Sequence, residues 1–263
     1  MLQLSQRTVR VVDCLNEGSD AHSYILEPFN FIPVDTVNIG QFFQLDLPGG
    51  AQSKFVYTVL PQRNGHFKLL CANGDKRLQY KLKKGMILGY AGPFGRGWPV
   101  DKLIGAEVLI VAGDAGLAPV ASVIDFLIAQ GQQDNTTVIY GSQSSTMQIL
   151  SKEREYWRSK LLLYETVEAT GEQLAQGSPA EFISTLLADH DRQPQIVLTC
   201  GSDSLMIAVA DLCRSLVIGS SNIWLLKETL MQLPVCGCAS HRYSPGNASQ
   251  YDPIRCYEQL FSH

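Results

Sequence analysis

The stretch VLIVAGDAGLAP, residues Val108–Pro119, decides the fold of this chain. Its apolar opening predicts a strand buried on both faces, which breaks at Gly113 and Gly116 and runs into an apolar periodic segment, 119–130, that predicts a helix. A strand, a tight turn and a helix start direct backbone N–H groups and the positive end of a helix dipole to one point, where a pyrophosphate can bind. The stretch falls short of a Gly-x-Gly-x-x-Gly fingerprint, because Asp114 and Ala115 stand between Gly113 and Gly116. An ordinary βα turn therefore remains the alternative.

Downstream of this turn, strands alternate with helical patterns. The strand-like runs are EVLIVA, TTVIYG, LLLYETV, QIVLTCG and NIWLLKE, and helices are expected near residues 119–130, 152–160, 179–188 and 204–216. This alternation predicts a parallel sheet covered by helices on both faces, with ligands in the crevice at the carboxyl ends of the strands. The segments expected at that edge are Gly113–Pro119, Gly141–Ser144 and Cys200–Asp203.

Upstream of the turn, residues 8–90 form short apolar or alternating runs separated by turn residues such as Asn64-Gly65. Evenly spaced strands with Asn-Gly turns and no helical period predict an antiparallel barrel or sandwich. The stretch GPFGRGWP, 92–99, is rich in Gly and Pro and predicts a junction between domains. We therefore expect an antiparallel β-barrel domain over 1–100, an α/β Rossmann-like domain with a parallel sheet over 101–230, and an irregular cysteine-containing tail over 231–263.

The composition excludes several classes of function. The chain has 263 residues, is 45% apolar and carries a net charge of −4, and it shows no Lys/Arg-rich face for nucleic acid. No apolar run approaches the roughly 18 residues that cross a bilayer, and the N-terminus lacks the apolar core of a signal peptide, so we expect a cytoplasmic protein without a membrane span. Seven cysteines without a secretion signal indicate free thiols or metal ligands rather than a disulfide framework.

Taken together, these features resemble the ferredoxin–NADP reductase superfamily. The resemblance rests on a β domain, a GPFG junction, VAGxxGxAP at the start of an α/β domain, and a Cys-Gly pair at the end of its fourth strand. Within the superfamily the chain looks most like electron-transfer subunits that carry FAD and a C-terminal [2Fe-2S] cluster, such as those of dihydroorotate dehydrogenase, sulfhydrogenase (gamma) and anaerobic sulfite reductase (B). This implies a subunit of an NAD(P)H-linked flavin oxidoreductase that exchanges electrons with a partner redox protein or catalytic subunit in a hetero-oligomer.

In the barrel, the resemblance implies a flavin site. The tetrapeptide FVYT, 55–58, stands where relatives have Arg-x-Tyr-Ser/Thr, so Tyr57 is expected to stack on the isoalloxazine and Thr58 to face flavin N5. Phe55 replaces the arginine that pairs with the FAD pyrophosphate, and Lys54 is expected on the opposite face of the strand. The alternative for Tyr57 is a core aromatic residue.

In the α/β domain, the resemblance implies a nicotinamide-nucleotide site. The segment 113–119 takes the place of Gly-Gly-x-Gly-x-Ala-Pro, although Asp114 adds a negative charge beside the expected pyrophosphate. Gln143 replaces an arginine that would meet a 2′-phosphate, so NADH is expected rather than NADPH. Cys200 and Gly201 match a Cys-Gly-Pro motif whose cysteine lies beside the nicotinamide ring, and the alternative for Cys200 is a small core residue at a strand end.

The residues expected at the cofactors therefore come from both domains. Tyr57, Thr58 and Cys200 are the candidates nearest to the reaction, and Arg77 is expected to supply the charge that Phe55 lacks. The full set of cofactor-binding candidates is Tyr57, Thr58, Gly74, Arg77, Gly92, Gly113, Gly116, Leu117, Ala118, Pro119, Cys200 and Gly201.

The tail carries the metal hypothesis. Relatives hold a [2Fe-2S] cluster with cysteines spaced C-x4-C-x2-C and a fourth about a dozen residues later, whereas this chain has Cys236, Cys238 and Cys256. A cluster could form from these three cysteines with His241 as a fourth ligand. A zinc site and a tail without metal are the two alternatives.

Two functions remain open on these residues. The first is the flavoprotein electron-transfer subunit, in which the cofactor carries the chemistry and no acid–base constellation is needed. The second is a diverged scaffold or docking subunit that has lost one or more cofactors, which Phe55, Asp114 and the altered cysteine spacing favour.

Overall fold

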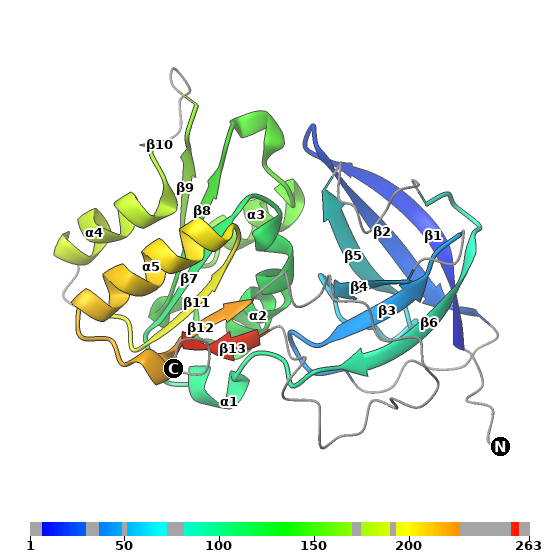
Figure 1. Ribbon diagram of the computed structural model, residues 1–263, viewed down its shortest axis with the longest axis horizontal. Coiled ribbons are helices and arrows are strands. Elements are labelled where there is room, and N and C mark those ends of the chain that lie inside the picture. Colours follow the sequence, from blue (N-terminus) through cyan, green and yellow to red (C-terminus); the bar gives the residue numbers. More distant parts are fainter. Residues whose placement is uncertain are drawn as a thin grey trace.

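The computed structural model describes residues 7–29, 37–48, 52–72, 82–169, 175–189, 193–226 and 254–257. Within these ranges the chain forms two sheets that lie side by side (Figure 1). The N-terminal sheet is antiparallel, and the second is largely parallel and covered by helices. The predicted fold class is therefore confirmed.

Six strands make up the N-terminal sheet: β1 (Arg7–Glu17), β2 (Ala21–Pro28), β3 (Phe42–Asp46), β4 (Gln52–Val56), β5 (Phe67–Ala72) and β6 (Ile87–Phe94). They follow the order β4-β3-β6-β1-β2-β5, and the sheet curls so that the chain after β4 meets β5 at a bridge between Val59 and Lys68. Successive side chains of a strand face opposite sides of the sheet. One set fills the interior of this half-barrel, where the rings of Phe43, Tyr57 and Phe67 lie 4.5 to 5.3 Å apart between centroids.

Seven strands make up the second sheet: β7 (Val108–Gly113), β8 (Thr136–Ser142), β9 (Leu162–Val167), β10 (Ala175–Gln176), β11 (Ile196–Cys200), β12 (Ile223–Leu226) and β13 (Ile254–Cys256). Their order is β10-β9-β8-β7-β11-β12-β13, and each pair is parallel except β12 with β13. The order reverses at β7, which has β8 on one side and β11 on the other. Ligands of open parallel sheets bind at such a reversal.

Helices cover both faces of the second sheet. The helices are α1 (Val100–Leu103), α2 (Leu117–Ala129), α3 (Ser151–Arg158), α4 (Pro179–Asp189) and α5 (Asp203–Ser215). Helices α2 and α3 lie on one face, and α4 and α5 lie on the other (Figure 1). Of the helices in the described ranges, none has the length and apolar character needed to cross a bilayer.

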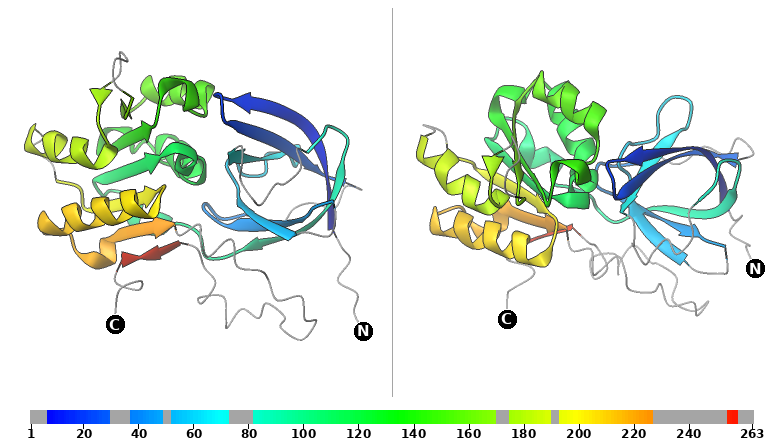
Figure 2. Two further views of the ribbon diagram at one scale, coloured as in Figure 1. Left: turned by 45° about the horizontal axis from the view of Figure 1, so that its top comes forward. Right: turned by 90° about the horizontal axis from the view of Figure 1, so that it is seen from above.

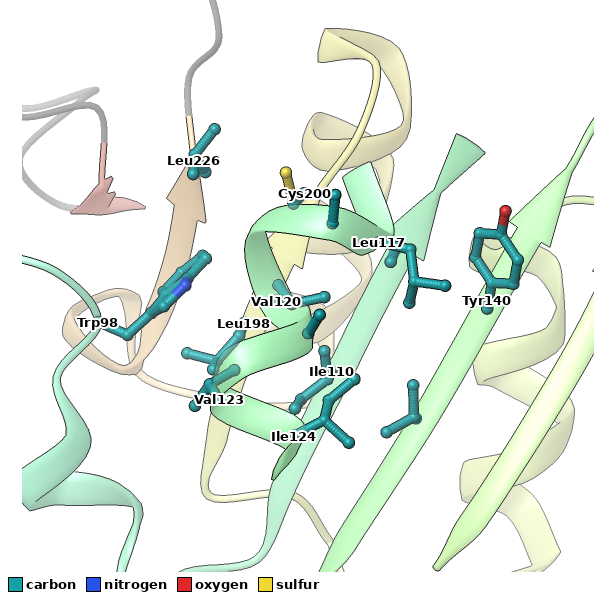
Figure 3. Close-up of a cluster of buried hydrophobic side chains, with 14 of the residues drawn as sticks. Trp98, Ile110, Leu117, Val120, Val123, Ile124, Tyr140, Leu198, Cys200 and Leu226 are labelled. Atoms are coloured by element: carbon teal, nitrogen blue, oxygen red, sulfur yellow. The ribbon is translucent and has the colours of Figure 1, made fainter. Parts of the chain in front are cut away.

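The two sheets share one apolar cluster, which we call the interdomain cluster. Phe42, Val56 and Leu70 extend from the outer face of the half-barrel and join the side chains between α2 and its sheet, including Leu117 and Cys200. The two sheets stay adjacent in both further views (Figure 2), and Figure 3 shows the part of the cluster around α2. Shared burial of apolar surface therefore holds the half-barrel against the α/β part.

Trp98 anchors the segment that connects the two sheets to helix α2. Its side chain is 3% exposed, lies in the interdomain cluster, and donates from Nε1 to the carbonyl of Pro119 at 3.1 Å. Figure 3 shows the indole beside α2. The connection is thus part of the core, although its composition predicts only a loop.

The structure corrects the expectation for the tail at 254–256. These residues form β13, which pairs antiparallel with β12 and places Ile254 in the interdomain cluster. Three residues are too few to show the alternation that identifies a strand in a sequence. The edge of β12 supplies the hydrogen-bonding partners that make this short segment a strand.

Candidate functional site

A pocket of about 250 Å³ lies at the carboxyl edge of the second sheet. The three segments expected there do converge, because Gly113, Gly141 and Ser202 all line it. Two further contributions were not anticipated: Glu168, directly after β9, and the start of α4 at Ser178–Ala180. Both follow the carboxyl end of a strand, which is the signal that could have identified them.

The turn after β7 brings only part of its motif to this pocket. Gly113 and Asp114 line it, whereas Gly116 and Leu117–Pro119 are buried beside the start of α2. Asp114 is exposed, has a φ of 46°, and accepts a hydrogen bond at Oδ1 from the backbone N–H of Gln143 at 3.2 Å. The Asp114 carboxylate, whose charge would repel a pyrophosphate, therefore also connects the β7 turn to the residue that follows β8.

Gly116 has a steric reason to be glycine. A Cβ at this position would collide with the carbonyl oxygen of Cys200 at the end of β11. The β7 turn can therefore approach the β11 turn closely enough for both to border one site. Gly92, in β6, has a comparable reason, since a Cβ there would press on Phe43 where the pairing of β3 with β6 shifts register.

Cys200 ends β11 and is fully buried. Figure 3 shows its side chain between α2 and Leu226, and it does not line the pocket. The following Gly201 has a φ of 153°, a conformation that favours glycine, and Ser202 then caps α5 by accepting the N–H of Leu205 at 3.2 Å. A helix N-terminus thus borders the pocket, while the nicotinamide contact of Cys200 stays a prediction.

Tyr57 lies inside the half-barrel. Its ring is 0% exposed among Phe43 and Phe67, and its hydroxyl makes a short hydrogen bond to the hydroxyl of Tyr90. A ring enclosed in this way has no face on which a flavin can stack. The expected stacking role of Tyr57 does not fit this position, and the alternative of a core aromatic residue does.

Lys54 lies on the face of β4 opposite to Phe55, as the sequence predicts. Phe55 and Tyr57 lie in the half-barrel core, so Lys54 and Val56, which flank Phe55 in β4, point outward, and Val56 joins the interdomain cluster. Lys54 is 7% exposed, and its Nζ lies 5.7 Å from the centroid of the Phe42 ring. Burial lowers the pKa of this ammonium. The face turned toward the α/β part therefore carries a desolvated cation.

The other predicted site residues divide between the described ranges and the rest of the chain. Gly74, Arg77, Cys236, Cys238 and His241 lie outside the described residues. Cys256 belongs to β13, pairs with Trp224, and is 6% exposed. Within the described ranges no three metal-binding side chains come together.

The carboxyl-edge pocket contains two acidic side chains, Asp114 and Glu168. The described residues that line it include serines, glycines and small apolar residues, but no lysine or arginine. The two carboxylates accept hydrogen bonds and repel anions, so they suit a neutral, hydroxyl-rich group better than an additional anionic group such as a 2′-phosphate.

Comparison with known proteins gives relatives along most of the chain, although no family model matches. The chain is 26% identical over 243 residues to sulfhydrogenase 1 subunit gamma of Pyrococcus furiosus, covering 86% of this chain and 82% of that one. It is 31% identical over 123 residues to sulfhydrogenase 2 subunit gamma of the same organism, covering 46% of this chain but only 40% of the relative. A probable dihydroorotate dehydrogenase B electron transfer subunit of Methanocaldococcus jannaschii is 25% identical over 206 residues, covering 78% and 72%.

The fold also matches solved structures. A cytochrome P450 reductase of Amycolatopsis superposes with a TM-score of 0.72 at 15% identity, covering 83% of this chain and 68% of that one. The chain is therefore a relative of the sulfhydrogenase gamma and dihydroorotate dehydrogenase electron-transfer subunits and has the two-domain fold of ferredoxin–NADP reductase-like proteins.

Proposed function

We propose that this chain is an electron-transfer subunit that takes electrons from NADH onto FAD and delivers them to a catalytic partner subunit. The observation that carries the proposal is the shared face between the two sheets. The outward residues of β4 and the carboxyl edge of β11 meet in the interdomain cluster, so a flavin on the first and a nucleotide at the second would be neighbours. The relationship to electron-transfer subunits supports this function, and it does not favour the scaffold alternative.

The outward face of β4 suits a flavin nucleotide. Lys54 offers a desolvated cation to a pyrophosphate, which is the contact for which Phe55 is unsuited. Thr58 stays the candidate hydroxyl for flavin N5; it is 1% exposed and Phe42 and Val56 pack in the interdomain cluster, so flavin binding here requires these side chains to be uncovered. A flavin bound there would supply the hydride acceptor and pass electrons on singly.

The carboxyl-edge pocket suits the adenosine half of a nicotinamide nucleotide. Serine hydroxyls and the capped start of α5 can bind a phosphate, and the Glu168 and Asp114 carboxylates can accept from a ribose diol. The same carboxylates would repel a 2′-phosphate. We therefore propose NADH as the electron donor in preference to NADPH.

For the tail we propose a [2Fe-2S] cluster, which would carry single electrons from the flavin to the partner. Its ligand candidates remain Cys236, Cys238, Cys256 and His241. Cys256 is held by β13 at the edge of the second sheet, which would anchor one end of the ligand segment. Zinc and no metal are the competing outcomes of the test.

An anaerobic absorption spectrum of freshly purified protein tests the function, with flavin, iron, sulfide and zinc quantified on the same sample. We expect flavin bands that NADH bleaches at concentrations far below those of NADPH, together with iron and sulfide. A colourless protein that binds no FAD on reconstitution would contradict the flavoprotein proposal. Flavin with zinc, or with no metal, would contradict the cluster alone.

A further inference from the structure

A buried group of charges joins the half-barrel to the α/β part. Lys68 in β5 places Nζ 3.1 Å from Glu17 of β1 and 2.7 Å from Glu153 of α3. The Lys68 and Glu17 side chains are 10% and 9% exposed, and that of Glu153 is 27% exposed. We call these three residues the interdomain triad. Buried charges of this kind persist only where pairing and hydrogen bonds compensate their desolvation.

Glu17 is the member that contacts the α/β backbone. Its Oε1 accepts from the hydroxyl of Ser23 at 2.6 Å, and its Oε2 accepts from the backbone N–H of Leu150 at 2.9 Å. Leu150 precedes α3 and has a φ of 55°, a left-handed conformation that a leucine rarely adopts. Strained residues persist where the surrounding structure holds them, and the Glu17 carboxylate does so here.

The β1–β2 turn adds two contacts to the same segment of the α/β part. Ser19 donates its backbone N–H to the carbonyl of Thr146 at 2.7 Å. Gly18 lies so close to the carbonyls of Thr146 and Gln148 that a Cβ would clash with both. The end of β1 is therefore fitted against residues 146–150, between β8 and α3.

This segment leads directly to the carboxyl-edge pocket. The chain enters it from Ser142 at the end of β8, which lines the pocket and donates from Oγ to the carbonyl of Ser144 at 2.9 Å. Ser144 and Thr146 join their hydroxyls at 3.0 Å, and Gln143 donates to Asp114. Polar contacts thus connect the pocket to Thr146, and the backbone continues from there to Leu150, whose N–H donates to Glu17.

Lys68 makes the corresponding link to the flavin-binding face. Its carbonyl accepts from the N–H of Thr58 at 2.9 Å, and its own N–H donates to the carbonyl of Val59 at 3.1 Å. Thr58 lies two residues after the end of β4. Lys68 therefore connects the chain just after β4, through its backbone, to α3, through its side chain.

We propose that Lys68, acting through Glu17 and Glu153, is a positioning residue that holds the nucleotide pocket at the correct distance from the flavin-binding face. The inference rests on the proposed function, and none of the three residues lines the carboxyl-edge pocket. Transfer between bound reactants is sensitive to distance, and a misplacement of about 1 Å can cost roughly 100-fold in rate. Replacing Lys68 by an uncharged residue would remove the cation that Glu17 and Glu153 share, and the repulsion between the two carboxylates would loosen the contact between the half-barrel and α3.

The test compares Lys68→Met with wild type, with Lys68→Arg as the conservative rescue and Lys152→Met, an exposed neighbour on α3, as the matched control. Glu153→Gln serves as a milder second variant should Lys68→Met unfold. Three quantities are measured: dissociation constants for FAD and NADH, the rate constant of flavin reduction at saturating NADH in rapid mixing, and backbone amide exchange over residues 143–150 in the cofactor-free protein.

We expect Lys68→Met to keep both dissociation constants within about threefold, to lower the reduction rate roughly 100-fold, and to speed amide exchange over 143–150. Lys68→Arg and Lys152→Met should resemble wild type, and Glu153→Gln should fall between. An unchanged reduction rate, or a loss confined to FAD affinity, overturns the positioning role. Wild-type protein that binds FAD and NADH without reduction of the flavin overturns the proposed function itself, and exchange then reports on the triad separately.

Discussion

At the scale of single residues, Lys54 is the side chain on which the proposed flavin binding would depend most. It is buried on the outward face of β4, where its charge has lost solvent. A charge-assisted hydrogen bond to a phosphate contributes about 1.5–3 kcal/mol, so Lys54→Met should weaken FAD binding roughly 10- to 100-fold. Quenching of flavin fluorescence measures the dissociation constant.

Two further variants make the Lys54 prediction specific. Lys84→Met removes an exposed lysine from the same half-barrel and should leave FAD affinity unchanged. Lys54→Arg keeps the cation and should retain most of the affinity. Equal affinities for wild type and Lys54→Met would show that the pyrophosphate binds elsewhere.

Asp125 on α2 predicts a pH dependence of stability. Burial raises the pKa of this carboxyl, although the indole N–H of Trp157 donates to it at 2.7 Å and lowers the pKa in part. A carboxyl whose pKa is raised in the folded state stabilises the protein at low pH and loses that contribution as pH rises through the raised value.

Asp125→Asn keeps an oxygen for the Trp157 indole and removes the buried charge. Its stability relative to wild type should therefore increase as pH rises from about 4, the ordinary value for Asp, through the raised pKa. Urea unfolding at a series of pH values measures the difference. A difference that is the same at every pH would mean that the Asp125 charge carries no cost in the folded state.

The direction in which the β4 side chains point shows why part of the candidate site could not be predicted from the sequence. Residues 53–58 are buried on both faces of the strand, so the apolar pattern does not say which set points inward. A one-residue change of register moves every side chain to the opposite face. The motif resemblance predicts Tyr57 at the cofactor, whereas in the structure Tyr57 is buried in the half-barrel core and Lys54 points to the outer face.

At the scale of elements, long periodic segments were predictable and short ones were not. The expected helix over 119–130 is α2, and that over 204–216 is α5, each within a few residues of its bounds. The carboxyl-edge segments were placed because strand ends in a parallel sheet meet at one edge. The three-residue β13 depends on β12, which lies about 30 residues away in sequence, and local pattern carries no such information.

Docking of β13 predicts a stability effect at Ile254. Its side chain is 4% exposed and lies in the interdomain cluster, close to Gly40. Ile254→Ala should lower the free energy of unfolding by about 2–4 kcal/mol, because it leaves a cavity in a packed core. Arg255→Ala, on the opposite side of the strand, should cost less than half as much, and chemical denaturation compares the two. Equal effects would contradict the docking of Ile254.

At the scale of the whole molecule, the interdomain cluster predicts one cooperative unit. Apolar contacts, Trp98 and the interdomain triad all cross between the two sheets. We expect a single calorimetric transition for the cofactor-free protein, with a ratio of calorimetric to van't Hoff enthalpy of about 1. Two resolved transitions would show that the half-barrel and the α/β part unfold independently.

The placement of β13 also bears on how any partner can attach. An uncovered strand edge is a template on which another chain can add a strand, and it invites aggregation. In the described ranges, the second sheet ends in β10, of two residues, on one side and β13, of three residues, on the other. Both borders are too short to seat an extended peptide. Within the described residues, neither edge of the second sheet therefore offers a long template on which another chain could add a strand.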